Sequence, residues 1–256
     1  MASDLPTILI TNDDGYFSPS LHALVEEAKK HYKVYVVVPD SNCSGVGRAV
    51  SLAMPIKVRE IEPDFYAISG TPVDCVCFAL GHVMKEPPRF IVSGINNACN
   101  LGTDVFCSGT VSAAMEGYMR GIPSIAVSQE QRGDYKRAAR LALRCGEAVV
   151  GGLPCLLNVN TPHDDFQHIV WTRLGLRQRK YDYSVDAKKD PRGKQYFWIG
   201  GGEIKTLSMP FQRQKTDCQA FLEGMASITP LHLDLTDYRA LEKTQFVIHP
   251  DECDQT

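Results

Sequence analysis

The chain has 256 residues, of which 44% are hydrophobic and 22% are charged, and its formal net charge is −3. This length suits one large α/β domain, and so small a net charge gives no indication of a broad surface for nucleic-acid polymers. The N-terminus lacks the features of a signal peptide, and no apolar run approaches the ~20 residues that cross a bilayer. We therefore expect a cytoplasmic protein without a membrane partner.

Strand and helix patterns alternate through the first part of the chain. Short apolar, β-branched runs predict buried strands at 7–11, 34–38, 90–92, 125–127 and 156–159. Apolar residues at helical spacing predict helices that begin near Ser18, Thr71, Thr110 and Asp134. This alternation predicts a doubly wound, Rossmann-like α/β fold with a mostly parallel sheet.

The pattern changes after about residue 165. Residues 169–176 and 195–199 are strand-like, and the polar stretch 177–194 between them predicts a projecting β-hairpin arm. We assign 1–165 to a core that binds metal and phosphate. We assign 166–256 to the arm and a C-terminal oligomerisation region packed on that core, within a single domain overall.

Three predicted strands continue into residues with oxygen-bearing side chains. The first leads into Asp13 and Asp14, the second into a loop that contains Ser44, and the third into Asn96. Ligands of doubly wound sheets bind beyond the carboxyl ends of the strands, so these side chains should meet. Carboxylates with neutral oxygens suit Mg²⁺ or Mn²⁺, and none of the seven histidines lies in these loops. A plain Asn-Asp-Gly turn is the alternative for the first loop.

A candidate anion site lies at Ser108, Gly109 and Thr110, where a helix begins. The free N–H groups and dipole of a helix N-terminus attract anions, and glycine lets the backbone approach a ligand closely. An ordinary Ser/Thr helix cap is the alternative, and the neighbouring metal site favours the anion site. Metal and anion sites together indicate phosphate hydrolysis by metal-activated water, with Asp14 and Asp40 as candidate bases.

Several ordered sequence blocks resemble the SurE family of 5′/3′-nucleotidases. They are ILITNDDG, VVPD-x-x-x-SGVG, SGTPVDCV, VSGIN-x-x-x-NLG, SGTVSAAMEG, GIP-S-IAVS and SITPL. The resemblance spans about residues 7 to 236 and implies a divalent-metal-dependent phosphatase that hydrolyses nucleoside 5′-monophosphates. Nucleoside 3′-monophosphates and short polyphosphate are further candidate substrates. It also implies a C-terminal element exchanged between the subunits of a homodimer or homotetramer.

The resemblance also implies site residues. The metal ligands of the family fall on Asp13, Asp14, Ser44 and Asn96, which would hold one Mg²⁺ or Mn²⁺ per subunit, with the two aspartates as catalytic carboxylates. The phosphate contacts of the family fall on Asn100, Ser108, Gly109 and Thr110.

This chain departs from the family pattern at three positions. Arg48 stands where the family usually has histidine, and we expect its guanidinium to bind phosphate instead of moving a proton. Ala98 stands where the family has glycine, and Cys107 where an aromatic residue is common. These changes bear on the conformation of the loop and on substrate choice.

The sequence argues against two other classes of nucleotide-binding protein. A dinucleotide-binding oxidoreductase needs G-x-G-x-x-G after the first strand, where this chain has NDDGYF. A P-loop NTPase needs G-x-x-x-x-G-K-[ST], which the chain lacks. A non-catalytic, metal-stabilised assembly protein stays open as an alternative, and an assay of phosphate release from nucleotides distinguishes it from an enzyme.

Overall fold

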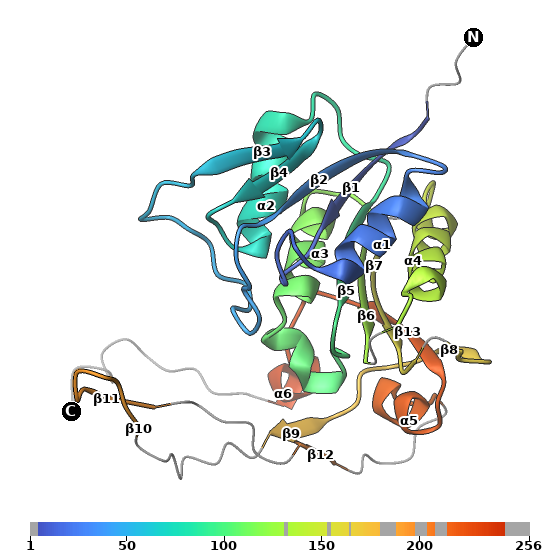
Figure 1. Ribbon diagram of the computed structural model, residues 1–256. Helices are drawn as coiled ribbons and strands as arrows, with labels where there is room; N and C mark the ends of the chain where they lie inside the picture. The colour runs from blue at the N-terminus through green and yellow to red at the C-terminus, as the bar shows by residue number, and fades with distance from the viewer. Residues whose placement is uncertain are drawn as a thin grey trace, which may run out of the picture.

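A mixed sheet of nine strands forms the centre of the molecule, with helices on both of its faces (Figure 1). The computed structural model describes residues 5–130, 133–152, 155–163, 165–179, 188–197, 204–207 and 214–243. The strands of the sheet are β1 (Thr7–Thr11), β2 (Lys33–Pro39), β3 (Val58–Glu62), β4 (Phe65–Ile68), β5 (Ile91–Asn96), β6 (Ser124–Gln129), β7 (Leu156–Thr161), β8 (Ile169–Trp171) and β13 (Ala226–Leu231).

The strand order is β3-β4-β2-β1-β5-β6-β7-β13-β8. The strands from β4 to β7 in this order pair in parallel, whereas β3 and β13 add antiparallel pairs with β4 and β7. The strands follow in chain order outward from β1 through β2 to β4 on one side and from β5 through β6 to β7 on the other, whereas the edge strands β3 and β8 are out of this order. The boundary between β1 and β5 is therefore the topological switch point, where doubly wound sheets bind ligands.

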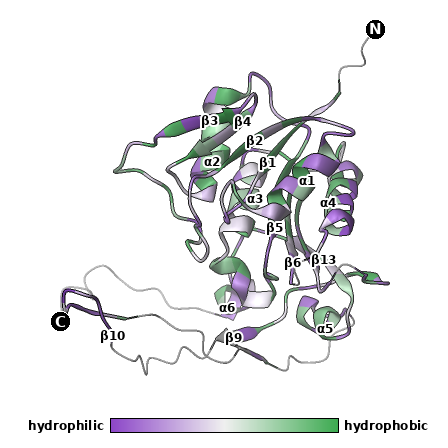
Figure 2. Cartoon of the chain, in the orientation of Figure 1, coloured by the Kyte–Doolittle hydropathy of each residue, from purple (hydrophilic) through white to green (hydrophobic). Residues whose placement is uncertain are grey.

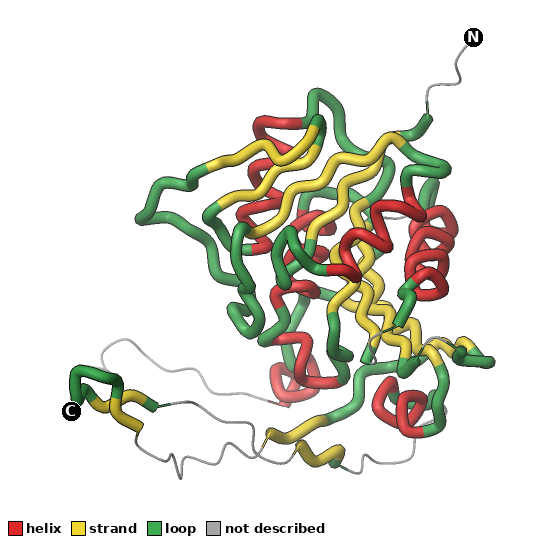
Figure 3. Tube along the Cα trace, in the orientation of Figure 1, coloured by secondary structure: helices red, strands yellow, loops and turns green. Residues whose placement is uncertain are grey.

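Helices form a layer on each face of the sheet, as the red and yellow segments of Figure 3 show. The helical elements are α1 (Pro19–Ala28), α2 (Pro72–Phe78), η1 (Ala79–Val83), η2 (Gly102–Phe106), α3 (Gly109–Met119), α4 (Lys136–Val149), α5 (Asp217–Leu222) and α6 (Tyr238–Lys243). Helices α1 and α4 pack on one face, and α2 and α3 pack on the other. Among the described residues, no helix is both long enough and apolar enough to cross a membrane.

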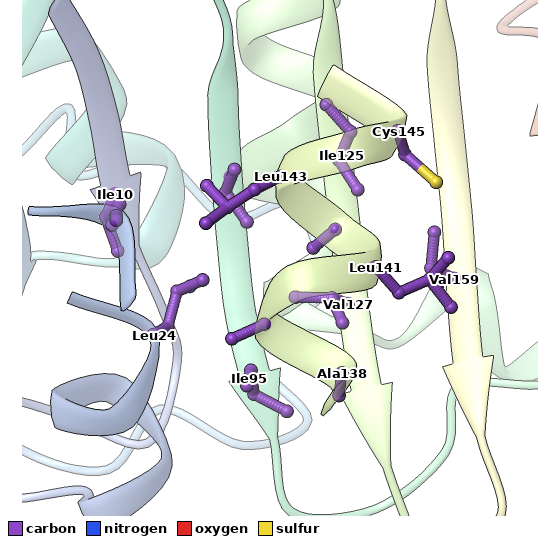
Figure 4. Close-up of a cluster of buried hydrophobic side chains, with 14 of the residues drawn as sticks. Ile10, Leu24, Ile95, Ile125, Val127, Ala138, Leu141, Leu143, Cys145 and Val159 are labelled. Carbon is purple, nitrogen blue, oxygen red and sulfur yellow. The ribbon is translucent and has the colours of Figure 1, made fainter. Parts of the chain in front are cut away.

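Alternation along the strands supplies both faces with apolar side chains. In β1, Ile8 and Ile10 belong to the cluster under α1 and α4, whereas Leu9 belongs to the cluster on the α2 side. This is the period of two that a strand buried on both faces requires. In α4, Leu141 and Cys145 lie over the sheet beside Val159 (Figure 4).

Helix α4 has one apolar and one polar side. Hydrophobic residues of α4 face the sheet and hydrophilic residues face away from it (Figure 2). Burial of its apolar side therefore holds α4 on the sheet, as is usual for an amphipathic helix.

The predicted α/β fold is confirmed, with corrections at element boundaries. Helix α3 begins two residues earlier than expected, because Ser108 and not Thr110 is its N-cap, and Thr110 lies inside the helix. Helix α4 begins at Lys136 and not at Asp134, and it is preceded by Tyr135 in a left-handed conformation. The predicted strand 169–176 is wrong beyond Trp171, where β8 ends.

The projecting arm is a two-part β-hairpin. Strands β9 (Arg177–Arg179) and β12 (Ile204–Thr206) form one antiparallel pair, and β10 (Lys188–Lys189) and β11 (Gln195–Tyr196) form a second one, nested within the first. Figure 1 shows β10 and β11 well away from the sheet. The end of the predicted strand 195–199 lies outside the described residues. So does 244–256, and the predicted C-terminal exchange stays a prediction.

Candidate active site at the β1–β5 switch point

A cavity of about 520 Å³ lies where β1 and β5 end and α3 begins. Its lining residues are Asp13, Asp14, Ser44, Gly45, Asn96, Asn97, Ala98, Cys99, Asn100, Asp104, Cys107 and Ser108. The structure therefore brings together the four predicted metal ligands and two of the predicted phosphate contacts. The cavity lies at the switch point of the sheet, where a ligand site is expected.

Asp13 is the buried carboxylate of the cavity, with 3% of the residue exposed. Thr110 donates two hydrogen bonds to it, from its hydroxyl to Oδ1 at 2.5 Å and from its backbone N–H to Oδ2 at 3.2 Å. Burial raises the pKa of Asp13, and the bonds from Thr110 offset this only in part. A nearby cation would stabilise the ionised form of this buried carboxylate.

Gly109 and Thr110 support Asp13 and do not line the cavity. A Cβ atom on Gly109 would lie 2.9 Å from the Cβ of Asp13, so a side chain at this position would displace the aspartate. Glycine is needed at position 109 because the Asp13 side chain packs against it, whereas the sequence predicted that it lets the backbone approach a ligand. The structure therefore does not give Thr110 the direct phosphate contact expected of it.

Asp14 is held by a residue that the sequence analysis missed. Nδ2 of Asn97 donates to Oδ2 of Asp14 at 2.8 Å, and Oδ1 of Asn97 accepts from the hydroxyl of Tyr135 at 2.8 Å. Asn97 follows the predicted ligand Asn96 directly, which is a weak signal. Nothing in the sequence points to Tyr135, because a contact across 38 residues depends on the fold.

The loop after β5 is held by side chains from the neighbouring strands. Glu130, after β6, accepts from the backbone N–H of Cys99 at 2.8 Å, and Asn160 of β7 accepts from that of Asn100 at 2.8 Å. The side-chain amide of Asn100 donates to Ser128 at 2.9 Å. Part of the hydrogen-bonding capacity expected to serve phosphate is thus already used within the protein.

Asn96 is oriented by its own loop. Its Nδ2 donates to the carbonyl of Ala98 at 2.6 Å, which leaves the side-chain oxygen as the atom that suits a cation. Ala98 is not among the non-glycine residues with positive φ, which in the described ranges are Asp64 and Tyr135. Alanine therefore fits the backbone conformation of the loop without strain at this position.

Ser44 lies on an exposed loop. The loop is attached by two backbone hydrogen bonds, from Cys43 N–H to the carbonyl of Asp13 at 2.7 Å and from Gly47 N–H to the carbonyl of Cys107 at 3.1 Å. These bonds place Ser44 at the cavity without burying it. Ser108 is different: it is 5% exposed, and its hydroxyl also caps α3 by accepting from Val111 N–H at 3.1 Å.

Arg48 does not reach the cavity. Its guanidinium forms an ion pair with Glu116 at 2.7 Å and lines a second cavity, of about 670 Å³, beside Met119. The expectation that Arg48 binds phosphate is therefore not supported by its position. Glu116 also pairs with Arg120 at 2.9 Å, and despite its burial these bonds lower the pKa of Glu116.

Asp104 and Cys107 also line the cavity and were not predicted as site residues. Asp104 is 7% exposed and forms an ion pair with Arg177 of β9. Thr103 donates a hydrogen bond to the carbonyl of Arg177. The first strand of the arm is thereby fastened to the loop that forms one side of the cavity.

The residues of the cavity fit a hard cation. In the described part of the chain, no group of three or more His, Cys, Asp and Glu residues is placed to bind a metal. A metal here would therefore depend on the two aspartates with the neutral oxygens of Ser44 and Asn96. Such an oxygen set suits Mg²⁺ or Mn²⁺ better than zinc or copper.

Comparison with known proteins identifies the family. Residues 8–181 match the family model of survival protein SurE. A protein of Syntrophotalea carbinolica named 5′-nucleotidase SurE is 41% identical over 242 residues, covering 92% of this chain and 94% of that protein. One of the same name from Pelobacter propionicus is 43% identical over 244 residues, covering 92% and 96%. The crystal structure of SurE protein from Aquifex aeolicus has a TM-score of 0.74 and 40% identity, covering 94% of this chain and 98% of that one. This chain belongs to the SurE family.

Proposed function

We propose that this chain is a 5′-nucleotidase that hydrolyses nucleoside monophosphates with one divalent metal ion per subunit. Nucleotidase activity is supported by two relatives named 5′-nucleotidase SurE, which are 41% and 43% identical to this chain over most of its length. Metal dependence is supported by the site itself. Hydrolysis of 3′-monophosphates and short polyphosphate is proposed on the family resemblance.

One observation carries the proposal. The cavity joins two carboxylates and neutral oxygens to the start of α3, yet among the described residues no Lys, Arg or His lines it. Asp104 is paired with Arg177, but a phosphate dianion would be repelled by Asp13 and Asp14 unless a cation balanced them. A volume of about 520 Å³ is in the range of sites that bind small molecules.

The residues of the site have distinct roles in this proposal. Asp13, Asp14, Ser44 and Asn96 would hold Mg²⁺ or Mn²⁺. When bound, that ion supplies Lewis-acid polarisation of the phosphoryl oxygens. Ser108, at the start of α3, lies where the N-terminal end of the helix favours negative charge. Asp14 lines the cavity and can accept a proton from water there, whereas Asp40 is exposed and does not line it.

Assembly and location are further proposals. We propose a homodimer or homotetramer with exchanged C-terminal elements, in which the arm contributes to the contact between subunits. We also propose a cytoplasmic location, with neither nucleic-acid polymers nor membranes as partners. The formal net charge of −3 supports the first of these exclusions.

The test is phosphate release from nucleoside 5′- and 3′-monophosphates with Mn²⁺, Mg²⁺ or chelator. We expect metal-dependent release that Asp14→Ala reduces by at least about 100-fold and that Asp40→Ala leaves within about threefold. If Asp40→Ala lost activity and Asp14→Ala kept it, Asp40 would be the base in place of Asp14. Folded wild-type protein that releases no phosphate with either metal would favour the non-catalytic assembly protein.

A second readout does not require turnover. A ligand that binds only the folded state stabilises it by about 2.7 kcal/mol at a hundredfold excess over its dissociation constant. We expect excess Mn²⁺ to raise the melting temperature of the wild type by several degrees and to leave that of Asp14→Ala nearly unchanged. An unchanged wild-type melting temperature across the titration would count against the metal site.

A further inference from the structure

We propose that Tyr135 is a positioning residue of the site, whose hydroxyl acts through Asn97 to fix the orientation of the Asp14 carboxylate toward a divalent cation. This inference rests on the proposed function, because it takes Asp14 as a metal ligand. It concerns a residue that lies outside the cavity lining and far from Asp14 in the sequence.

Chemistry fixes the direction of the two hydrogen bonds that link Tyr135 to Asn97 and Asn97 to Asp14. Oδ1 of Asn97 can only accept, so the hydroxyl of Tyr135 must donate to it across 2.8 Å. The amide group of Asn97 is thereby oriented, and its Nδ2 donates to Oδ2 of Asp14 at 2.8 Å. The carboxylate only accepts, so it selects the Nδ2 end of the amide, and the tyrosine hydroxyl holds the opposite end, Oδ1, in place.

The backbone at Tyr135 supports a specific role. Its φ is 56°, which is uncommon for a residue with a side chain, and such conformations cost roughly 1–3 kcal/mol. The residue stands at the N-cap of α4 and provides no side-chain cap there. The ring is buried, with 5% of the residue exposed, in the cluster under α1 and α4. The fold therefore tolerates an unfavourable backbone while the hydroxyl reaches Asn97.

The consequence concerns the geometry of Asp14. A carboxylate with one oxygen anchored has less freedom to rotate, so the ligand is already oriented before a cation binds. Hydrogen-bond partners of metal ligands typically change metal affinity by about 10–100-fold when they are removed. Without the tyrosine hydroxyl, the Asn97 amide keeps its bond to Asp14 but loses its second anchor, so it restrains the carboxylate less.

The decisive variant is Tyr135→Phe, with Tyr32→Phe as its matched control. Tyr32 is also buried, at 8% exposure, and its hydroxyl donates to Glu147 at 3.0 Å on the α1–α4 side of the sheet. Each variant removes one tyrosine hydroxyl and its hydrogen bond. General loss of stability should therefore affect both, whereas loss of metal affinity should be confined to Tyr135→Phe.

The measurement is the dissociation constant of Mn²⁺ alone, from the paramagnetic resonance signal of free Mn²⁺. We expect about tenfold weaker binding in Tyr135→Phe and a change within about twofold in Tyr32→Phe. In an Asn97→Ala background, Tyr135→Phe should have no further effect on Mn²⁺ affinity, because the hydrogen-bond connection between Tyr135 and Asp14 is already lost. In turnover assays the Mn²⁺ concentration for half activation should rise by the same factor, with little change in kcat at saturating Mn²⁺.

Two results would overturn the inference. One is equal loss of Mn²⁺ affinity in the two tyrosine variants, and the other is additive effects of Tyr135→Phe and Asn97→Ala. Absence of Mn²⁺ binding by the wild-type protein would also overturn the proposed role of Tyr135. A wild-type protein that binds Mn²⁺ but releases no phosphate would remove only the proposed function, because the binding measurement still decides the role of Tyr135.

Discussion

Two walls of the cavity are built in different ways. The strand-end wall, formed by Asp13, Asp14, the loop 96–100 and Ser108, is held by side-chain hydrogen bonds from α3, β6 and β7. The loop wall, formed by residues 40–47, is exposed at Ser44 and attached by backbone bonds to Asp13 and Cys107. Changes in the strand-end wall should therefore disturb the fold and the metal site together, whereas changes in the loop wall should affect mainly the metal site.

The largest contrast is expected between Gly109→Ala and Gly45→Ala. A Cβ on Gly109 would meet Asp13 at 2.9 Å and Pro72 at 3.1 Å, whereas a Cβ on Gly45 would meet nothing within 4 Å. We expect Gly109→Ala to lose about 1–3 kcal/mol of stability through overpacking and about 100-fold in kcat/KM through displacement of Asp13. Urea unfolding and turnover assays measure the two effects.

Gly45→Ala tests the other wall by the same measurements. Gly45 has φ of +78°, so alanine should cost about 1 kcal/mol of backbone strain. We expect a smaller loss of activity than in Gly109→Ala, below about tenfold. If the two variants lost equal activity, the proposed difference between the walls would be wrong.

A second prediction concerns the hydroxyl of Thr110. Thr110→Val keeps the backbone bond to Asp13 but removes the side-chain bond to Oδ1. We expect about 1–2 kcal/mol less stability and about tenfold weaker Mn²⁺ binding. Thr172→Val is the control, because its buried hydroxyl bonds to Thr229 and lies outside the site. Weaker Mn²⁺ binding in both variants would show that the effect is general destabilisation.

The third prediction uses pH to test the hydrogen bonds that hold Ser51, which lies just beyond the loop wall in the sequence. Asp74 accepts hydrogen bonds from the backbone N–H of Ser51 at 3.1 Å and of Thr71 at 2.8 Å. Burial acts to raise the pKa of Asp74, but these bonds lower it overall. Because the folded-state pKa is lowered, its stabilisation is present above about pH 4 and is lost as pH falls through the folded-state pKa.

Asp74→Asn should therefore lower stability by about 1–2 kcal/mol at pH 7, and the difference from wild type should shrink below pH 4. Urea midpoints measured between pH 2.5 and pH 7 give this difference directly. A constant difference across that range would mean that the charge of Asp74 does not hold the loop. Activity at pH 7 should fall less than in Gly109→Ala, because Asp74 is not among the residues lining the cavity.

The sequence predicted the site residues at the ends of strands better than the residues that hold the site in place by hydrogen bonds. Asp13 and Asn96 are predictable because a buried strand precedes each of them, and the carboxyl ends of parallel strands meet at one edge. Tyr135, Asn97 and Glu130 were missed because their roles depend on contacts between segments far apart in the chain. No local periodicity encodes such contacts.

At Thr110 and Arg48 the structure differs from the sequence-based prediction for local reasons. Thr110 was taken for a helix cap because threonine is a common one, but Ser108 takes that place and leaves Thr110 to bind Asp13. Arg48 was assigned to phosphate from its position in a motif. The motif says which loop carries the side chain but not which way the side chain turns, and Glu116 of α3 provides a partner outside the residues that line the candidate site.

The smallest effect is expected from Arg48→Met, which tests this last point. The Arg48 side chain is 36% exposed, and Glu116 keeps Arg120 as a partner, so the loss of stability should be about 0.5–1 kcal/mol. Because the guanidinium lines the second cavity, KM for nucleotides should stay within about twofold of wild type. Arg120→Met is the matched control, since it removes the other partner of Glu116. A rise in KM of tenfold or more, seen in Arg48→Met alone, would return Arg48 to the phosphate site and show that the loop wall rearranges when substrate binds.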